Sequence, residues 1–260
     1  SAELAQAVVE HQCVPLLLLC VKEPEVSLKK VAASTLSYIC GHSSELAQAV
    51  VDAEGVPDIA PLIENPQVKR QACTCLANIA KHSVTLAEIV VDGEIFPKIF
   101  TLLNDPDDPI VRKNAATCIR EIAKHTPELS AHVVNSGGLP AIVDYVKNAE
   151  GDNKLPGIMT LGFIAAFSET MAMSVIDAKA IKPLSHALSG EMSDHVKAAA
   201  AWVLGQIGRH SSDHSQRVAE ANIFKMLLDV YFNPNSSDDL KTKAKRSLKA
   251  VIQKCLYLEA

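Results

Sequence analysis

A ten-residue motif recurs along the whole chain, and this repetition constrains the fold more than any other feature of the sequence. The segment from Ser1 reads SAELAQAVVE, and the segment from Ser43 reads SSELAQAVVD. Related segments begin at Ser83, Thr126, Ser168 and, more weakly, Ser211. The period is about 42 residues, and a period of this length predicts a stack of helical units.

The start of each unit predicts a short amphipathic helix. A Ser or Thr hydroxyl at this position can accept a hydrogen bond from a free backbone N–H of the first turn. Thr126-Pro127-Glu128 adds a proline at the first helical position and an acid in the first turn. Apolar residues follow at i, i+4 spacing, as in Leu4/Val8, Leu46/Val50, Leu86/Val90, Leu129/Val133 and Met171/Val175.

A break and a second helix follow in each unit. In the first four units the break carries glycine or proline, at Val14-Pro15, Gly55-Val56-Pro57, Phe96-Pro97 and Gly137-Gly138-Leu139-Pro140. Glycine permits unusual backbone angles, and proline can start a helix but not continue one. The fifth and sixth units have Ile181-Lys182 and Phe224-Lys225 here instead. We predict second helices such as 58–63 and 141–146.

The last part of each unit predicts a longer, alanine-rich third helix after a polar link. The links include 64–66, 104–109 and 190–194, and the helices are expected near 68–81, 111–124 and 196–209. Alanine faces allow helices to approach closely. No unit can bury its apolar face alone, so the units must stack into one continuous core.

Three helices in about 42 residues, with a Gly/Pro break and an alanine-rich third helix, resemble the armadillo repeat. Residues 199–207, AAAWVLGQI, are similar to its signature. The resemblance implies an all-α, right-handed superhelical solenoid of about six three-helix repeats. We predict a single solenoid over 1–260, with repeats at 1–42, 43–82, 83–125, 126–167, 168–210 and 211–260.

Five longer segments narrow this resemblance: 45–53, 119–129, 155–159, 196–202 and 253–258. They are similar to the sperm-associated antigen six family, armadillo proteins of the ciliary and flagellar central apparatus. The resemblance implies a non-enzymatic scaffold of the central pair that supports beating, with central-apparatus proteins as partners. It implies a location in the cytoplasm and cytoskeleton, within the axoneme of the cilium or flagellum.

Members of that family are longer, so the chain is expected to be a segment of a longer repeat protein. Solenoids normally end in atypical polar repeats. Here the first unit begins almost as the second does, and the chain stops at 256–260, directly after a third helix. We therefore expect both ends to offer helix faces that can pack on another layer, and we predict end-to-end self-association.

A basic residue recurs near the start of every third helix. The six are Lys29, Lys69, Arg112, Lys154, Lys197 and Lys241, and the first three are followed by Lys30, Arg70 and Lys113. In armadillo proteins the third helices line the groove, so the resemblance implies a row of cations that would suit an extended acidic partner such as a tubulin tail. The alternative is an ordinary solvated helix start. Pro156-Gly157 is expected to delay the helix that follows Lys154.

An alignment of the six third helices also tests an alternative function, an importin-alpha-like or catenin-like adaptor that binds extended peptides. Import adaptors repeat a Trp and, four residues later, an Asn. The Trp positions here hold Ser34, Thr74, Thr117, Met159 and Trp202, and the Asn positions hold Tyr38, Asn78, Glu121, Phe163 and Gln206. Only scattered positions match, and the groove is basic where a cationic signal would need acids. Tyr38, Asn78, Glu121, Trp202 and Gln206 remain candidate groove residues.

Histidines recur at the end of the third helices. They are His42, His82, His125 and His210, with Phe167 at the fourth position. A histidine near a helix C-terminus meets the negative end of the helix dipole and can fill a gap between repeats. This interpretation is favoured over a metal site, because successive repeats hold the rings too far apart to share an ion and because Phe167 cannot bind one.

Composition and motifs exclude several other functions. The net charge of −5 and pI near 6.0 disfavour general nucleic-acid binding, and no apolar run of ~20 residues predicts a membrane span. Seven cysteines without zinc-ligand spacing fit free thiols in a reducing compartment. GxSxG, P-loop, HExxH and dinucleotide-binding motifs are all missing, so neither catalysis nor a cofactor is expected.

Overall fold

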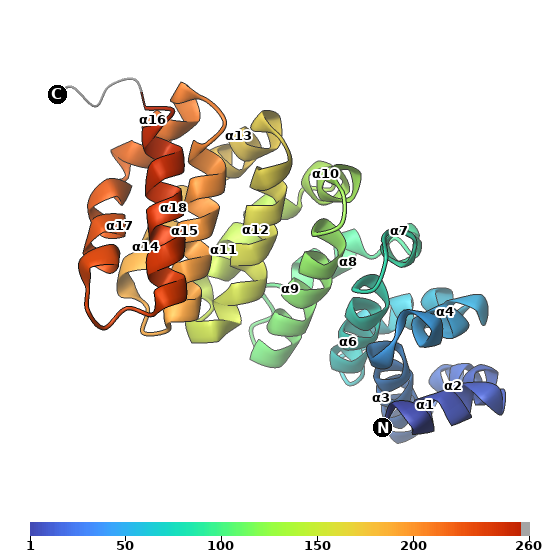
Figure 1. The fold of residues 1–260 in the computed structure, drawn as a ribbon. Coiled ribbons are helices and arrows are strands. Elements are labelled where there is room, and N and C mark those ends of the chain that lie inside the picture. The colour runs from blue at the N-terminus through green and yellow to red at the C-terminus, as the bar shows by residue number, and fades with distance from the viewer. Residues whose placement is uncertain (256–260) are drawn as a thin grey trace. The chain divides into compact units, whose positions relative to one another are not determined.

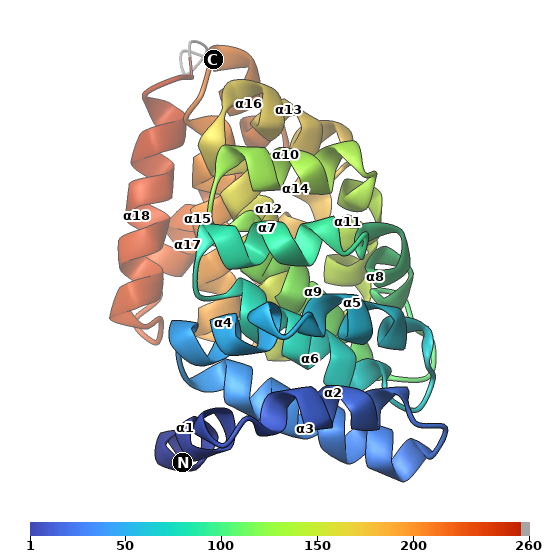
Figure 2. The same cartoon turned by 90° about the vertical axis from the view of Figure 1, so that its right-hand side faces the viewer.

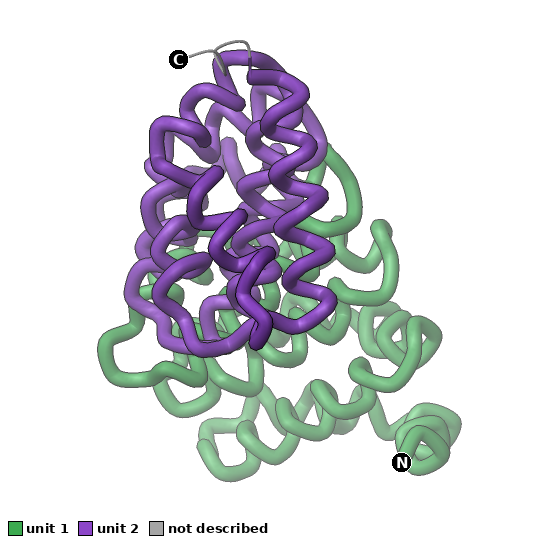
Figure 3. Tube along the Cα trace, turned by 60° about the vertical axis from the view of Figure 1, so that its left-hand side comes forward, with its two compact units in different colours: residues 1–129 green, residues 130–260 purple. Residues whose placement is uncertain are grey.

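A computed structural model describes residues 1–255, which form 18 α-helices and two short 3₁₀ helices without any β-strand (Figure 1). The predicted all-α class is therefore confirmed. The chain divides into two compact units, residues 1–129 and 130–260 (Figure 3). The chain end at 256–260, which includes part of the segment 253–258, lies outside the described residues.

The first unit contains three helical triplets. They are α1 (Ala2–Glu10), α2 (Cys13–Lys22) and α3 (Val26–His42); α4 (Ser44–Asp52), α5 (Gly55–Ile59) with the 3₁₀ helix η1 (Ala60–Glu64), and α6 (Lys69–Ala80); and α7 (Val84–Asp92), α8 (Phe96–Leu102) and α9 (Pro109–Ala123). The third helix α6 packs between α3 and α9, while α1, α4 and α7 are layered on another side (Figure 2).

The second unit repeats this arrangement after α10 (Pro127–Asn135), which crosses the boundary between the units. The remaining elements are α11 (Gly138–Asn148), η2 (Gly151–Lys154) and α12 (Leu155–Phe167); α13 (Glu169–Asp177), α14 (Ile181–Gly190) and α15 (Asp194–Gly208); and α16 (Ser212–Glu220), α17 (Ile223–Phe232) and α18 (Asp238–Ile252). The third helices α12, α15 and α18 lie side by side (Figure 1).

The second helix of the second triplet differs from the sequence-based expectation. Instead of one helix over 58–63, the chain forms α5 and then the 3₁₀ helix η1. Pro61 supplies no backbone N–H and its ring crowds the preceding turn, so the chain tightens locally. The third helices α6, α9 and α15 begin and end within about two residues of the expected positions.

The helix caps follow the sequence motif in five of six cases. Ser1, Ser43, Ser83, Thr126 and Ser168 each accept a hydrogen bond from the backbone N–H three residues later. Ser211 is different, because its hydroxyl lies 2.8 Å from Nδ1 of His214 and does not cap α16. The weak motif at this position thus corresponds to a different local hydrogen bond.

A left-handed residue separates the first two helices of every triplet. The residues with positive φ at this point are Gln12, Glu54, Glu94, Gly137, Lys179 and Asn222. Their spacing matches the sequence repeat, although only one is glycine. This turn explains how the fifth and sixth triplets break their helices without the Gly/Pro signal, since any residue that tolerates the left-handed conformation ends the first helix.

Replacing Glu54 with glycine should stabilise the protein, because glycine reaches φ of 61° without the steric cost of a Cβ. The expected gain in the free energy of unfolding is about 0.5–1 kcal/mol, measured by urea denaturation. Glu88→Gly is the matched control, since Glu88 is exposed inside α7 and its replacement should cost about 1 kcal/mol. Equal destabilisation by both variants would contradict the assignment of strain at Glu54.

Neighbouring third helices are joined by a contact that we call the carbonyl clamp, formed by a basic residue and a histidine at the end of the helix. In the first unit, Nζ of Lys81 donates to the carbonyl of Gly41 at 2.6 Å, and Nε2 of His82 lies 2.7 Å from the carbonyl of Cys40. Carbonyls in the last turn of a helix have no intrahelical partner. The clamp therefore satisfies the C-terminal end of α3 from the end of α6.

The carbonyl clamp recurs elsewhere in each unit. Lys124 and His125 bind the carbonyls of Lys81 and Ala80 at 2.8 and 2.7 Å. In the second unit, Arg209 and His210 bind the carbonyls of Ala166 and Ala165, both at 2.7 Å. The structure thus confirms the packing interpretation for His82, His125 and His210. His42 differs, since its exposed ring contacts Tyr38 edge-on with centroids 4.6 Å apart.

Acidification should weaken the clamp at His210. Desolvation by burial lowers the pKa of this imidazole below its usual range, despite the hydrogen bond to Ala165. The folded chain then binds the proton less readily than the unfolded chain. The stability contributed by neutral His210 is consequently complete above the unfolded pKa of about 6.5 and is lost as pH falls through the lower folded value.

His210→Phe, which copies Phe167 of the fourth triplet, should reduce the drop in thermal midpoint between pH 8 and pH 5.5. Melting followed by circular dichroism at both pH values measures this difference. Exposed His195 gives the control variant His195→Phe, whose pH dependence should match the parent protein. An unchanged pH dependence in His210→Phe would contradict the assignment.

The first layer leaves several apolar side chains uncovered. Leu4 is 68% exposed, whereas Leu46 and Leu86 at the same motif position are 4% and 1% exposed. Leu16, Leu19 and Val31 are also exposed. The predicted end-to-end association would cover these side chains. That association stays a prediction.

Among the described residues, no single helix has both the length and the apolar composition to cross a membrane. Only α1 and α2 taken together reach that length and composition, and they are bent by 89°.

Candidate functional site

Ion pairs within the chain neutralise part of the predicted row of cations. In the first unit, Lys69 at the start of α6 pairs with Asp105, and the two side chains are only 16% and 8% exposed. Arg70 pairs with Asp108 in the same link. Lys69 and Arg70 are therefore not freely available to a partner, because carboxylates of the next triplet already occupy their charge.

The acidic link 104–109 has two structural functions. Oδ1 of Asp105 accepts hydrogen bonds from the backbone N–H groups of Asp107 and Asp108 at 3.1 and 3.0 Å. Oδ1 of Asp108 caps α9 by accepting from Ile110 and Val111. In each aspartate, Oδ1 thus binds backbone N–H groups, while Oδ2 faces a cation of α6.

These contacts lower the pKa of both carboxyls. For Asp105, the hydrogen bond from Lys69 is the main cause. For Asp108, burial opposes ionisation, but the hydrogen bonds from Arg70 and from the backbone of α9 outweigh it. Both groups therefore remain charged well into the acid range, and the pairs persist at neutral pH.

The second unit contains a third pair of this kind. Nζ of Lys154 lies 3.0 Å from a carboxylate oxygen of Glu191, and the two side chains are 12% and 19% exposed. Lys154 lies in η2, and α12 begins only at Leu155 with Pro156 in its first turn. This position fits the delayed helix start expected from the proline.

The other predicted cations carry no ion pair among the described residues. Lys29 and Lys30 lie at the start of α3, and Arg112 and Lys113 lie at the start of α9. In the second unit, Lys197 lies in α15, and Lys241 of α18 makes a long 3.5 Å hydrogen bond to the carbonyl of Pro234. Lys30 and Lys113 are the exposed members of the first unit's free set.

A polar hollow of about 290 Å³ lies on the third helices of the first unit. Its lining includes Ser34, Arg70, Thr74 and Asn114 from α3, α6 and α9. Nδ2 of Asn114 donates to Oγ1 of Thr74 at 2.9 Å, so each of these two polar groups already has a hydrogen-bond partner. Oε1 of Gln71, in the same lining, is buried without a hydrogen-bond partner among the described residues.

The predicted Asn-position residues of the first unit have different surroundings. Tyr38 is 57% exposed. Nδ2 of Asn78 donates to the carbonyl of Ser37 at 2.9 Å, so it joins α6 to α3. Glu121 is buried and pairs with Arg120 and Lys124.

The pKa of the Glu121 carboxyl is lowered, because the hydrogen bonds from Lys124 and Arg120 outweigh the effect of burial. The carboxylate of Glu121 is therefore neutralised locally, although it occupies a position predicted to line the groove. Tyr38 is the exposed member of these three residues, although its hydroxyl accepts a 3.4 Å hydrogen bond from the N-terminal amine of Ser1 and its ring contacts His42.

Trp202 and Gln206 lie on α15 in the second unit. The indole of Trp202 meets Phe163 edge-on with ring centroids 5.6 Å apart. A Cβ on Gly162 would lie 2.1 Å from this indole, so the ring occupies space that only glycine leaves on α12. Trp202 thus packs between helices, and half-buried Gln206 makes no hydrogen bond among the described residues.

No candidate metal centre is found among residues 1–255. The structure places no three His, Cys, Asp or Glu side chains so that they could hold a metal ion. All seven cysteines are free thiols. Burial raises the pKa of Cys73 to about 12, which keeps this thiol protonated and unreactive at neutral pH.

Replacing Lys69 with methionine should destabilise the protein by about 1 kcal/mol, because Asp105 then keeps a poorly solvated charge without its cation. Adding Asp105→Asn should recover part of the loss, and urea denaturation of both single variants and the double variant measures the coupling. The pKa of Asp105 is lowered, so this contribution is present above pH ~4 and lost as pH falls. A Lys69→Met effect that stays constant down to pH 3 would argue against the pair.

Comparison with solved structures decides the fold. A designed armadillo repeat protein superposes with a TM-score of 0.85 at 22% identity, over 92% of this chain and 99% of that one. An engineered protein superposes with a TM-score of 0.87 at 22% identity, over 92% and 98% of the two chains. The chain has the armadillo-repeat fold. Another such structure is a designed armadillo repeat protein in complex with the peptide (KR)4, with a TM-score of 0.85 at 21% identity over 92% of this chain and 99% of that one.

Sequence comparisons agree with the armadillo fold and also identify similar proteins of known name. The Armadillo/beta-catenin-like repeat model matches residues 1–41, and the HEAT repeat model matches residues 95–126. Sperm-associated antigen 6 from Mus musculus and from Homo sapiens is 53% identical over 77 residues. This match covers 30% of the armadillo chain and only 15% of each relative. The resemblance expected from the sequence is thus confirmed over part of the chain.

Proposed function

We propose that this armadillo chain is a non-enzymatic protein-binding scaffold of the axonemal central pair, which supports ciliary or flagellar motility. The observation that carries the proposal is the 53% identity to Sperm-associated antigen 6 over 77 residues. The armadillo-repeat fold supports the general role, because a stack of helices offers extended surfaces to partners. The buried, protonated Cys73 and the paired Glu121 provide no catalytic constellation.

The free cations of the third helices favour an acidic partner. In the first unit these are Lys29 and Lys30 on α3, and Arg112 and Lys113 on α9. Each exposed charge contributes little alone in salt, but several charges along one extended acidic segment act together. Acidic tubulin tails and acidic segments of central-apparatus proteins have the required chemistry.

A cationic peptide fits these positions less well. The designed armadillo protein that binds (KR)4 shows that the fold can hold a basic peptide. Here a basic peptide would meet Arg112 and Lys113, while the buried acid Glu121 of the same helix is already paired with Arg120 and Lys124. An importin-like role would need free acids at these positions.

Charge reversal at the two exposed free cations, Lys30→Glu and Lys113→Glu together, should weaken binding of a 12-residue polyglutamate peptide roughly tenfold at low salt. Fluorescence anisotropy with the whole chain measures the affinity. The matched control is Lys225→Glu/Lys254→Glu, which makes the same charge change at exposed lysines outside the predicted row. Equal losses in both variants would show a general effect of net charge and contradict the proposed surface.

The cellular role needs a separate measurement. The chain immobilised on beads should retain central-apparatus proteins or tubulin from an axoneme extract, identified by mass spectrometry, and Lys30→Glu/Lys113→Glu should retain less. Selective retention of Lys/Arg-rich nuclear-localisation peptides, with no axonemal protein above the level of empty beads, would instead favour the importin-like adaptor.

A further inference from the structure

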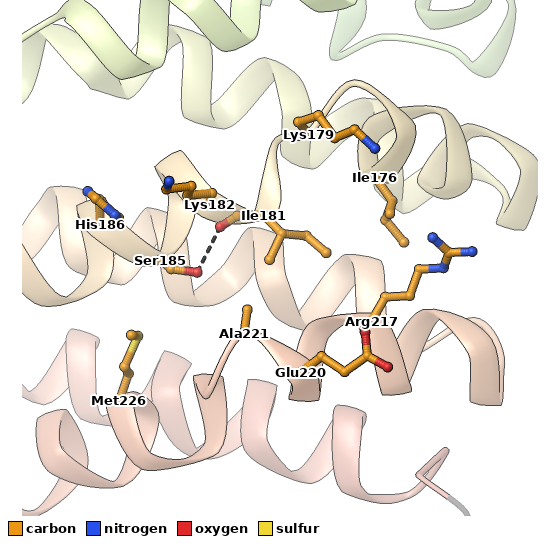
Figure 4. A pocket seen from close by; sticks show the side chains of 10 residues that line it. All are labelled: Ile176, Lys179, Ile181, Lys182, Ser185, His186, Arg217, Glu220, Ala221 and Met226. Carbon is orange, nitrogen blue, oxygen red and sulfur yellow. Dashed lines mark hydrogen bonds between the residues drawn. The ribbon is translucent and has the colours of Figure 1, made fainter.

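Two hollows in the second unit lie next to α14 and share some of its residues. The first, of about 670 Å³, lies between α13, α14, α16 and α17, and Figure 4 shows its lining side chains. The second, of about 520 Å³, lies between α11 and α14. Lys179, Lys182 and His186 line both hollows. The third helices, which carry the cations described above, supply no residue to either lining.

Both hollows combine an apolar lining with a basic edge. Ile176, Ile181 and Met226 supply carbon surface to the first hollow (Figure 4). Pro140 and Val143 do the same in the second. The hydroxyl of Ser185 does not add a free polar group, because it donates to the carbonyl of Ile181 at 2.8 Å. Apolar side chains of a partner could therefore cover this carbon surface without depriving the Ser185 hydroxyl of a hydrogen-bond partner.

The charge around the hollows is positive, although the chain is acidic overall. The linings contain the cations Lys147, Lys179, Lys182 and Arg217 against two acids, Asp144 and Glu220. Of these cations, only Arg217 has a carboxylate partner among the described residues, at 3.5 Å from Asp213. The chain as a whole carries a net charge of −5. Three unpaired lysines in one region thus create a local attraction for anionic groups.

The backbone fixes the position of Lys179. This residue has φ of 67° in the turn between α13 and α14, and its N–H donates to the carbonyl of Ile176 at 2.8 Å. Gly137 occupies the equivalent turn before α11, so the fold does not need a lysine there. A lysine at this turn carries a conformational cost that glycine would avoid, and Lys179 lines both hollows from this turn.

We propose that the two hollows form a second binding site, for an acidic segment of a partner protein that carries apolar side chains. The apolar side chains enter the hollows on either side of α14, and the carboxylates contact Lys179 and Lys182. Charge complementarity selects the acidic character of the segment, and the recessed carbon surface selects the apolar side chains. A flat anionic membrane fits less well, because lipid headgroups cannot fill recesses between helices.

Two 16-residue fluorescent peptides test this site on the whole chain. One peptide is glutamate-rich with two leucines, and the other replaces both leucines by serine. Anisotropy should show binding of the leucine peptide at least fivefold tighter than the serine peptide, because only leucine gains from the hollows. Equal affinity of the two peptides would overturn the proposal, as would equally strong binding of the chain to vesicles of anionic lipid.

Variants locate the binding. Lys179→Gly/Lys182→Gln should weaken the leucine peptide roughly tenfold, while Lys30→Gln/Lys113→Gln on the third helices should change its affinity less than twofold. Met226→Gln, which keeps the side-chain length, should reduce the preference for leucine over serine. The opposite pattern, with loss only at Lys30 and Lys113, would overturn the second site and leave the proposed third-helix surface intact.

Folding of the variants can be checked independently. Lys179→Gly removes the Cβ from a left-handed turn, so its thermal midpoint should not fall below that of the parent chain. A loss of peptide binding with an unchanged or raised midpoint therefore reports on the contact itself. Retained binding in a well-folded Lys179→Gly/Lys182→Gln variant would refute the role of the two lysines.

Discussion

The carbonyl clamp between third helices is the contact on which each unit's architecture depends. A helix C-terminus leaves carbonyl oxygens without partners, and burying them unsatisfied would be costly. Lys81 and His82 satisfy the end of α3, and Arg209 and His210 satisfy the end of α12. Each clamp joins residues one repeat apart, so it holds neighbouring third helices in a fixed register as well as capping them.

The opposite ends of the third helices in the first unit are joined by the acidic link before α9. Asp105 and Asp108 organise the link with one oxygen and bind Lys69 and Arg70 with the other. A carboxylate that stabilises the stack in this way removes two cations from the surface that a partner could use. The function of the third-helix surface is therefore limited by the same pairs that fix its geometry, and its free charge lies on α3 and α9.

The second unit presents a different chemistry on a different set of helices. Around α14 the left-handed turn at Lys179 and the neighbouring Lys182 bring unpaired charge to the edges of two apolar hollows. On the third helices of the same unit, Lys154 is paired with Glu191 and Trp202 packs against Phe163. A scaffold with two such surfaces could hold two acidic segments that differ in apolar content, since one surface relies on charge and the other on charge together with burial.

The sequence by itself determined the order of the helices, most of the caps on the first helix of each unit and the role of the clamp histidines. These features depend on neighbours within a few residues or on the repeat itself, as with Ser43 capping α4. Tertiary structure alone decided that Lys69 is paired while Lys30 has no ion pair within residues 1–255, and that Lys179 lines two hollows. The reason is physical: an ion pair or a hollow joins side chains from different helices, and their distances depend on packing that no local pattern specifies.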